Sequence, residues 1–357
     1  MEHRKLGATG ISVSPLCLGA MMFGAWGNTD HDDSIAIIHA ALDAGINFID
    51  TADVYSRGES EEIVGKALAG GRRESVVLAT KAHGRMHDSD PNEFGNSRRW
   101  LVKEVESSLR RLKTDWIDLY QIHRPEPDTD IDQTLGALSE LVAAGKVRMI
   151  GSSTFPAWQI VEAQWTAERR GRERFVCEQP PYSMLIRAIE RDVLPACLEY
   201  GMGVIPWSPL AGGWLSGRYS KGGDSPGSSR RAQMLPSRYD MSIPANQAKL
   251  AAAQALGELA EQAGMPLIEM SLRFVTSHPA VTAAIIGPRT MEQLESQLPA
   301  LERPVLPDDV LDRIDQLVAP GTNVNQADTG WDPPWLTDAA LRRRPAPADP
   351  PSATETA

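Results

Sequence analysis

The stretch SVVLAT at residues 75–80 decides how the chain is read, because a short run that is apolar almost throughout is followed at once by Lys81. A strand that is apolar at successive positions, rather than at alternate ones, is typical of a strand buried on both faces. An unpaired ammonium at the end of such a strand would cost several kcal/mol. The sequence therefore predicts that Lys81 has either a charged partner or a chemical role.

Polar side chains follow two other apolar runs in the same way. Asp50 ends the run INFI, His123 follows WIDLYQI at residues 116–122, and Tyr55 lies five residues after Asp50. If these runs are neighbouring parallel strands, their carboxyl ends meet at one edge of the sheet, where α/β folds place their sites. We therefore expect Asp50, Tyr55, Lys81 and His123 to lie together.

Strand and helix patterns alternate along most of the chain. The strand candidates are 15–19, 46–50, 75–80, 116–122, 147–151, 175–178, 203–206 and 281–286, and helical patterns occupy 34–45, 59–70, 97–112, 131–144, 157–169, 186–200 and 291–301. We expect Asp32 or Asp33 to cap the first helix. Eight such units in roughly 300 residues predict an α/β fold of the parallel (β/α) TIM barrel type. A doubly wound open sheet is the alternative.

Three segments lie outside this repeat. Residues 4–14 are expected to form a small hairpin that caps the barrel. A Gly- and Ser-rich loop and two helices, at about 246–263 and 267–276, separate the last two strands, and a connection this long is usually a functional cover or disordered. We divide the chain into a barrel, 1–318, and a C-terminal extension, 319–357, with a flexible Pro- and Ala-rich end. Trp331 and Trp335 are candidates to pack back onto the barrel.

Composition excludes several classes of function. The net charge of −11 argues against general binding to nucleic acid or to an anionic membrane, and no apolar run reaches the roughly 18 residues of a membrane helix. The N-terminus lacks the pattern of a secretory signal, so we expect a cytoplasmic protein. Cys17, Cys177 and Cys197 have no C-x-x-C spacing and are expected to be buried, reduced thiols. Without H-x-H, H-E-x-x-H or a Cys/His cluster, no metal site is predicted.

The four clustered residues suit proton transfer to a carbonyl oxygen. A tyrosine has an unperturbed pKa of about 10, and a neighbouring lysine stabilises the phenolate and lowers that pKa. Asp50 would keep Lys81 charged and oriented, Tyr55 would act as the acid, and His123 would hydrogen-bond the substrate oxygen. The alternative is that Asp50 and Lys81 form a structural ion pair and Tyr55 packs on a loop.

Seven segments in order resemble the aldo-keto reductase family: AGINFIDTADVYSRGESEEIVGKAL (44–68), VVLATK (76–81), LKTDWIDLYQIHRP (112–125), GKVRMIGSST (145–154), EQPPYS (178–183), WSPLAGGWLSG (207–217) and IIGPRTMEQL (285–294). The resemblance covers about residues 4–318. It implies a β/α barrel that uses NAD(P)H to reduce aldehydes and ketones, with Asp50, Tyr55, Lys81 and His123 as its catalytic tetrad.

The resemblance also implies a cofactor site. The sequence pattern alone does not indicate one, because the chain has no G-x-G-x-x-G fingerprint. The implied cofactor-binding residues are Gly19, Ala20, Met21, Asp50, Ser153, Gln179, Trp207, Ser208, Pro209, Leu210, Gly212, Gly287, Arg289, Gln293 and Gln297. Arg289 could meet a 2′-phosphate, which favours NADPH over NADH. Thr154, Ser296 and Gln297 depart from the usual family residues and weaken individual contact assignments.

The expected partner is a small-molecule carbonyl substrate, and the sequence does not indicate an oligomeric state. Its pocket would be walled by Met22, Phe23, Trp26, Tyr55, His123 and Trp214. An apolar, aromatic wall suggests a bulky or aromatic carbonyl compound. The family also includes cofactor-binding subunits that act chiefly through protein partners, and these keep the same tetrad, so a regulatory or partner subunit with little turnover is the alternative function.

Overall fold

Eight parallel strands form one sheet in this structure, a computed structural model that describes residues 2–219, 223, 226, 230–303 and 305–344. The strands are β3 (Leu16–Gly19), β4 (Phe48–Asp50), β5 (Val77–Ala82), β6 (Ile117–Ile122), β7 (Val147–Ser153), β8 (Phe175–Gln179), β9 (Gly203–Val204) and β10 (Ala284–Ile286). Each strand from β3 to β8 pairs with the next in the chain, and β10 pairs with β3.

The sheet closes on itself between β9 and the residues that lead into β10. Val204 forms a parallel bridge with Val281, and Thr282 and Ile285 donate backbone hydrogen bonds to Val204 and Pro206. A doubly wound sheet would have two open edges and a reversal of strand order, and neither is present among the described strands. The TIM barrel prediction is therefore confirmed.

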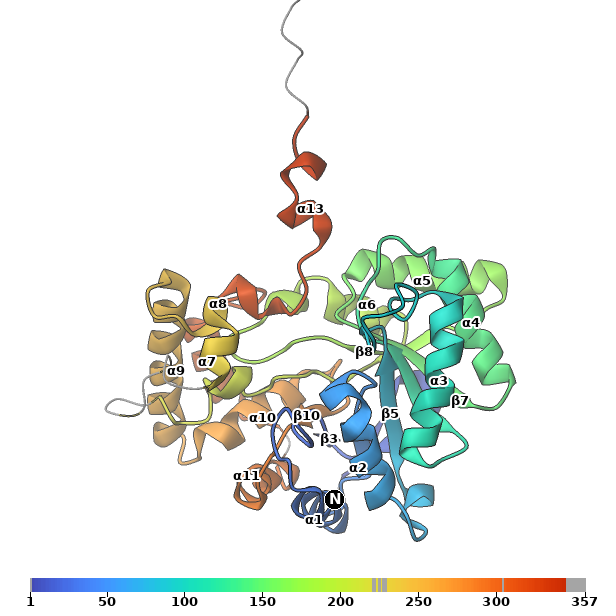
Figure 1. The fold of residues 1–357 in the computed structure, drawn as a ribbon. Coiled ribbons are helices and arrows are strands. Elements are labelled where there is room, and N and C mark those ends of the chain that lie inside the picture. Colours follow the sequence, from blue (N-terminus) through green and yellow to red (C-terminus); the bar gives the residue numbers. More distant parts are fainter. Residues whose placement is uncertain (1, 220–222, 224–225, 227–229, 304, 345–357) are drawn as a thin grey trace, which may run out of the picture.

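Helices surround the sheet, as Figure 1 shows. The long ones are α1 (His31–Asp43), α2 (Glu59–Ala67), α3 (Arg98–Leu112), α4 (Ile131–Ala143), α5 (Ala157–Arg170), α9 (Pro244–Gln262), α10 (Leu267–Ser277) and α12 (Asp308–Leu317), and the short ones are α6 (Val193–Glu199), α7 (Arg230–Met234), α8 (Pro236–Tyr239), α11 (Met291–Gln297) and α13 (Pro334–Thr337). In the part of the chain that the structure describes, no helix combines the length and the apolarity that crossing a membrane requires.

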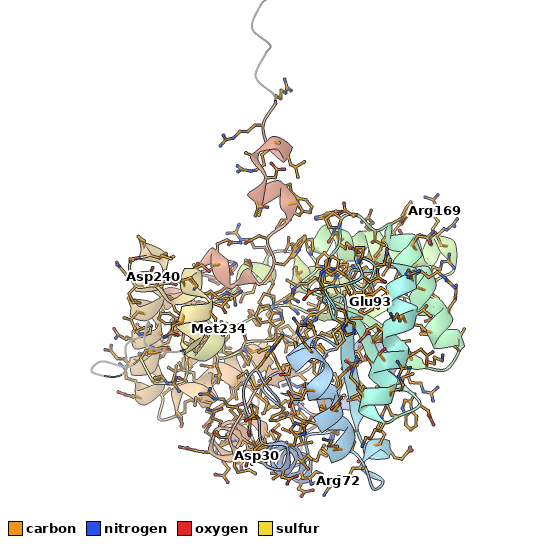
Figure 2. The ribbon with its side chains drawn as sticks, viewed as in Figure 1. Asp30, Arg72, Glu93, Arg169, Met234 and Asp240 are labelled. Carbon is orange, nitrogen blue, oxygen red and sulfur yellow. The ribbon has the colours of Figure 1, made fainter. Side chains whose placement is uncertain are left out.

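Alternation along the strands divides the core in two. Side chains such as Leu78 and Ile150 face the helices, whereas Phe48, Ala79 and Leu119 fill the barrel interior. Figure 2 shows side chains filling the space between the sheet and its helices. This double burial explains why the strands read as continuous apolar runs.

The N-terminal hairpin is present and closes one end of the barrel. Strand β1 (Arg4–Lys5) pairs antiparallel with β2 (Ser12–Val13), and Leu6 between them is fully buried in the barrel interior. Gly7 lies so close to the start of β9 that a Cβ there would come within 2.5 Å of the backbone nitrogen of Gly203. The hairpin therefore caps the end of the barrel where the strands begin.

Two helix predictions need correction. Asp30, which is labelled in Figure 2, caps α1 in place of Asp32 or Asp33. Its side chain accepts hydrogen bonds from the backbone N–H groups of both of those residues. The helix predicted from residue 186 begins at Val193 instead. Arg187 and Ala188 donate their backbone N–H groups to Thr322 and Asn323 of the C-terminal segment, so this part of the backbone does not join the helix.

The two helices predicted between the last strands are present as α9 and α10, but part of the glycine-rich loop before them, and the end of the C-terminal extension, lie outside the described residues. Helix α13 stands away from the end of the barrel in Figure 1. Its Trp335 contacts Trp158 of α5, with ring centroids 6.0 Å apart, and Trp331 lies at the same distance from Trp335.

Candidate active site

Asp50 and Lys81 form a buried ion pair at the carboxyl ends of β4 and β5. The Lys81 Nζ lies 2.5 Å from Asp50 Oδ2 and 2.9 Å from the backbone oxygen of Thr51. The Lys81 side chain is fully buried, and although burial acts to lower its pKa, the charge of Asp50 and the hydrogen bonds to Asp50 and Tyr55 outweigh burial and raise it. Lys81 is therefore an ammonium at neutral pH.

Two glutamines hold the other oxygen of Asp50. Gln121 on β6 and Gln179 on β8 donate their side-chain N–H groups to Asp50 Oδ1 at 3.1 and 2.8 Å. Gln179 also donates to the side-chain oxygen of Gln121 at 3.2 Å. The carboxylate is thus satisfied on both oxygens, as a buried charge requires.

Tyr55 is presented to this pair by a tight turn. Ser56 and Arg57 adopt positive φ angles of 49° and 54°, in the short helical turn Tyr55–Gly58 that precedes α2. The Tyr55 hydroxyl lies 3.3 Å from Lys81 Nζ. Burial raises the pKa of Tyr55, and the charge of Lys81 only partly offsets that effect. This reverses the predicted direction, since the lysine does not bring the pKa below its ordinary value, and Tyr55 carries its proton at neutral pH.

His123 follows β6 and faces the Tyr55 ring. The two rings are 5.6 Å apart and nearly perpendicular, at 81°. Burial, followed by the charges of Arg124 and Lys81, lowers the pKa of His123 well below its ordinary value. The imidazole is therefore neutral at pH 7 and has one N–H group to donate. The structure thus brings together the four residues that the sequence placed at successive strand ends.

The residues expected to bind a cofactor lie at or after the carboxyl ends of five strands of the same barrel. Gly19, Ala20 and Met21 end β3, Ser153 and Gln179 end β7 and β8, Trp207, Ser208, Pro209, Leu210 and Gly212 follow β9, and Gly287, Arg289, Gln293 and Gln297 follow β10. Ser208 and Gly212 have positive φ angles of 57° and 68°, so the chain after β9 folds into a compact turn.

The residues present fit a nicotinamide dinucleotide. Gln179 uses its amide N–H groups on Asp50 and Gln121, which leaves its carbonyl oxygen free of hydrogen bonds in the described part of the chain, as an acceptor for a carboxamide. Trp207 is partly exposed and pairs through its backbone with Pro181, two residues after Gln179, where it could stack on the cofactor. A Cβ at Gly287 would meet nothing within 4 Å, so the chain leaves open space after β10.

The predicted substrate wall is only partly supported. Trp26 is half exposed, and its ring lies 6.0 Å from that of Tyr55, while Met22 is partly exposed. Phe23 is completely buried in the helix-side core and Trp214 is 1% exposed, stacked on Tyr239. Those two predictions are wrong in this structure, because neither side chain offers surface to a substrate.

Reasoning from the sequence missed Gln121 and Arg124. Gln121 is the polar residue inside the apolar run DLYQI, and Arg124 directly follows His123 in the segment QIHRP. A polar side chain within an otherwise apolar strand was the available signal for Gln121. Arg124 had no such signal, because an arginine on a loop is ordinarily solvated.

The C-terminal segment also reaches the site. Asp328 accepts a hydrogen bond from the buried Lys249 of α9 at 2.8 Å, and Arg238 donates to the backbone oxygen of Ala327. Two residues further on, Gly330 lies against Trp207, and a Cβ there would come within 2.5 Å of the indole. The segment therefore covers one edge of the tryptophan expected to stack on the cofactor.

A model of the family described as "Aldo/keto reductase family" matches residues 15–319. The chain is 41% identical over 313 residues to the "Uncharacterized oxidoreductase YrpG" of Bacillus subtilis, covering 85% of this chain and 91% of that protein. It is 36% identical over 302 residues to the "Aldo-keto reductase YhdN" of the same organism, covering 83% and 87% of the two chains. It is also 32% identical over 323 residues to a "Probable voltage-gated potassium channel subunit beta" of Arabidopsis thaliana, covering 89% and 97%.

Proposed function

The chain belongs to the aldo/keto reductase family, and from that premise we propose that it is an NADPH-dependent enzyme that reduces an aldehyde or ketone to an alcohol. The observation that carries the proposal is the 3.3 Å contact between the Tyr55 hydroxyl and the Lys81 ammonium, which is itself paired with Asp50 at 2.5 Å. It joins a protonated phenol to a buried positive charge.

Tyr55 is the proposed general acid. Its raised pKa keeps the proton on the phenol until a substrate oxygen becomes basic enough to take it. Such a positioned acid contributes roughly 10² to 10⁴-fold in rate. When the proton leaves, the phenolate forms beside the ammonium of Lys81, which stabilises the new negative charge.

His123 and Asp50 position the reacting groups. The neutral His123 donates an N–H to the carbonyl oxygen and holds it toward Tyr55, and its near-perpendicular contact with the tyrosine ring fixes the orientation of both side chains. Asp50 keeps Lys81 charged and pointed at the phenol. Because the whole cluster is buried, these interactions act in a medium of low dielectric.

NADPH would supply the hydride for the carbonyl carbon. Ser153 and Gln179 are the proposed contacts of its carboxamide and Trp207 of its ring, while the turn Ser208–Gly212 is proposed to hold the pyrophosphate. Gly19, Ala20 and Met21 would contact the cofactor at the end of β3. At the adenosine end we assign Gly287, Arg289, Gln293 and Gln297, with Arg289 on the 2′-phosphate because its exposed guanidinium offers a planar donor fork.

The same proposal assigns a place in the cell and a domain division. An NADPH-dependent reductase with three buried free cysteines suits the reducing cytoplasm. We keep the barrel as 1–318 and the C-terminal extension as 319–357.

The test is the Tyr55→Phe substitution, which removes the proton and keeps the ring. The variant should lose NADPH-dependent reduction of a simple aromatic aldehyde, followed by absorbance of the reduced cofactor, while NADPH still quenches tryptophan fluorescence. Tyr120→Phe is the matched control, because the Tyr120 hydroxyl is buried on β6 without a hydrogen-bond partner in the described residues. Undiminished turnover by Tyr55→Phe would refute the mechanism.

The similarity to a probable potassium channel subunit favours a second candidate function, a cofactor-binding subunit that acts through a protein partner. Steady-state kinetics separates the two. An enzyme oxidises many equivalents of NADPH per protein molecule with excess carbonyl compound, whereas a partner subunit turns over little with every carbonyl tested.

A further inference from the structure

Arg124 lies at the edge of the tetrad, between the ends of β6 and β7. Its Nη1 donates to the backbone oxygen of His123 at 2.5 Å and lies 3.3 Å from the hydroxyl oxygen of Thr154. Burial raises the pKa of Tyr55 and lowers that of His123, and Arg124 is among the charges that act on both groups. The guanidinium is therefore held close to the proposed general acid and the residue that orients the carbonyl.

The positive charge of Arg124 has no full counterion in the part of the chain that the structure describes, where it makes no ion pair. The carboxyl group whose charge acts on Arg124 is that of Glu178, whose oxygens accept hydrogen bonds from the Ser152 hydroxyl and the Phe155 backbone. Burial raises the pKa of Glu178 to about 7, so this group carries only part of a negative charge at neutral pH.

A second guanidinium lies near that of Arg124. Arg238 on α8 is close enough for its charge to act on Arg124, and it lies beside Trp207 and Ser208 at a small hollow of the barrel mouth. Its distance of 3.8 Å to Asp328 is long for an ion pair. Two neighbouring cations at the barrel mouth favour the binding of an anion there, although the chain as a whole has a net charge of −11.

The free donors of Arg124 have the geometry of a carboxylate site. Both of its side-chain hydrogen bonds use Nη1, and neither Nε nor Nη2 donates to any described residue. These two nitrogens form the side of the guanidinium that offers parallel N–H groups to the two oxygens of one carboxylate. Lysine, a point charge, could not offer that fork.

The geometry points to a carbonyl substrate that carries a carboxylate, bound by the Nε and Nη2 groups of Arg124 while its carbonyl oxygen lies between Tyr55 and His123. This inference rests on the proposed reductase function and adds to it a substrate class, the aldehyde or keto acids. The carboxylate does not react. It orients the substrate and adds affinity through a charge-assisted, two-point hydrogen bond.

The experiment compares 3- and 4-carboxybenzaldehyde with their methyl esters, which keep the ring and aldehyde and remove only the charge. For the wild-type protein we expect kcat/KM to favour at least one acid over its ester by about 10- to 100-fold, the range of a charge-assisted hydrogen bond. Arg124→Met should abolish that preference, and Arg124→Lys should keep only part of it.

Ester kinetics and cofactor binding distinguish this role from a structural one. In Arg124→Met the kcat/KM for the ester and the dissociation constant of NADPH should each stay within about threefold of wild type. The control Arg72→Met removes a positive charge before β5, at the opposite end of the barrel, where Figure 2 labels Arg72. Arg72 pairs there with Asp43, and the variant should keep the full preference.

The possible failures are separable. A wild-type protein that reduces acid and ester equally well, or an Arg124→Met variant that keeps the preference, overturns the carboxylate site and leaves the reductase proposal standing. A variant that loses activity on acid and ester alike shows that Arg124 is structural. A wild-type protein that reduces neither compound nor any other aldehyde, in the presence of NADPH, overturns the proposed function itself.

Discussion

The Asp50→Asn substitution is the sharpest test of the buried charge pair at this site. The amide has the shape of the carboxylate, and its oxygen can still accept the hydrogen bonds from Gln121 and Gln179. The other position of the amide becomes an N–H group that faces Lys81 Nζ at the present separation of 2.5 Å. The substitution therefore removes the counterion of a fully buried ammonium and sets two hydrogen-bond donors against each other.

The expected cost is that of one uncompensated buried charge. Removing one partner of a buried pair destabilises a protein by about 3 to 5 kcal/mol. Alternatively, Lys81 can lose its proton and so avoid burying an unpaired charge. At pH 7 this deprotonation costs about 4 to 5 kcal/mol for a group with an unfolded pKa of about 10.4. Both routes predict a loss of about 3 to 5 kcal/mol at pH 7.

The pH dependence has a definite sign. In the wild type the pKa of Lys81 is raised, so its contribution is complete below the unfolded pKa and is lost only as pH rises through the still higher folded pKa. In Asp50→Asn the folded pKa falls below the unfolded value, so the unfolded chain binds more protons and stability rises with pH. The deficit of the variant should therefore shrink between pH 7 and pH 9.

Reversible urea unfolding followed by tryptophan fluorescence measures both quantities. The double variant Asp50→Asn with Lys81→Met removes the charge as well and should recover most of the loss, because an apolar side chain can replace a buried ion pair at little cost. Glu140→Gln, which breaks an exposed pair with Arg98, should cost far less than Asp50→Asn, because solvent screens an exposed ion pair. A loss below about 1 kcal/mol for Asp50→Asn, or a double variant as unstable as the single one, would refute the reasoning.

Two further predictions concern groups outside the tetrad. Burial raises the pKa of Glu178 to about 7, so this carboxyl favours folding below its unfolded pKa and that contribution is lost as pH rises toward 7. The free energy of unfolding of Glu178→Gln, relative to that of the wild type, should therefore rise by roughly 3 kcal/mol between pH 5 and pH 8 in urea unfolding. A difference between the two proteins that does not change with pH would contradict this prediction. Arg289→Ala should weaken binding of NADPH more than that of NADH, measured by fluorescence titration, and equal losses would remove its proposed phosphate contact.

Much of the fold could be predicted because each strand is buried on both faces and each is followed by a helix with its own apolar stripe. The eight strand candidates all contain a strand, although β5 continues through Lys81 to Ala82 and β9 keeps only Gly203 and Val204. Strand boundaries depend on which neighbour offers hydrogen bonds, and a single segment does not carry that information. The barrel register that sets Lys81 beside Gln121 is a property of pairs of strands.

The surroundings of the site were harder to predict because they come from distant segments. Phe23 and Trp214 look like wall residues in sequence, yet the first lies within the core and the second is covered by Tyr239 and Lys249. The segment around Asp328 reaches α9 through contacts that span more than seventy residues. A local apolar pattern shows that a side chain will be buried, but it does not show which surface will bury it.

The pKa of Tyr55 shows how burial changes the role that its neighbour can play. From the sequence a lysine beside a tyrosine suggests an acid whose pKa is brought down toward neutrality, but here the desolvation of the phenolate outweighs the attraction of Lys81. The resting site therefore holds a firmly protonated phenol next to a permanent cation, with the positive charge in place before any negative charge exists. A charge fixed in that way needs no reorganisation when proton transfer creates the phenolate, so the proposed contribution of Lys81 falls on the transition state and not on the resting acid.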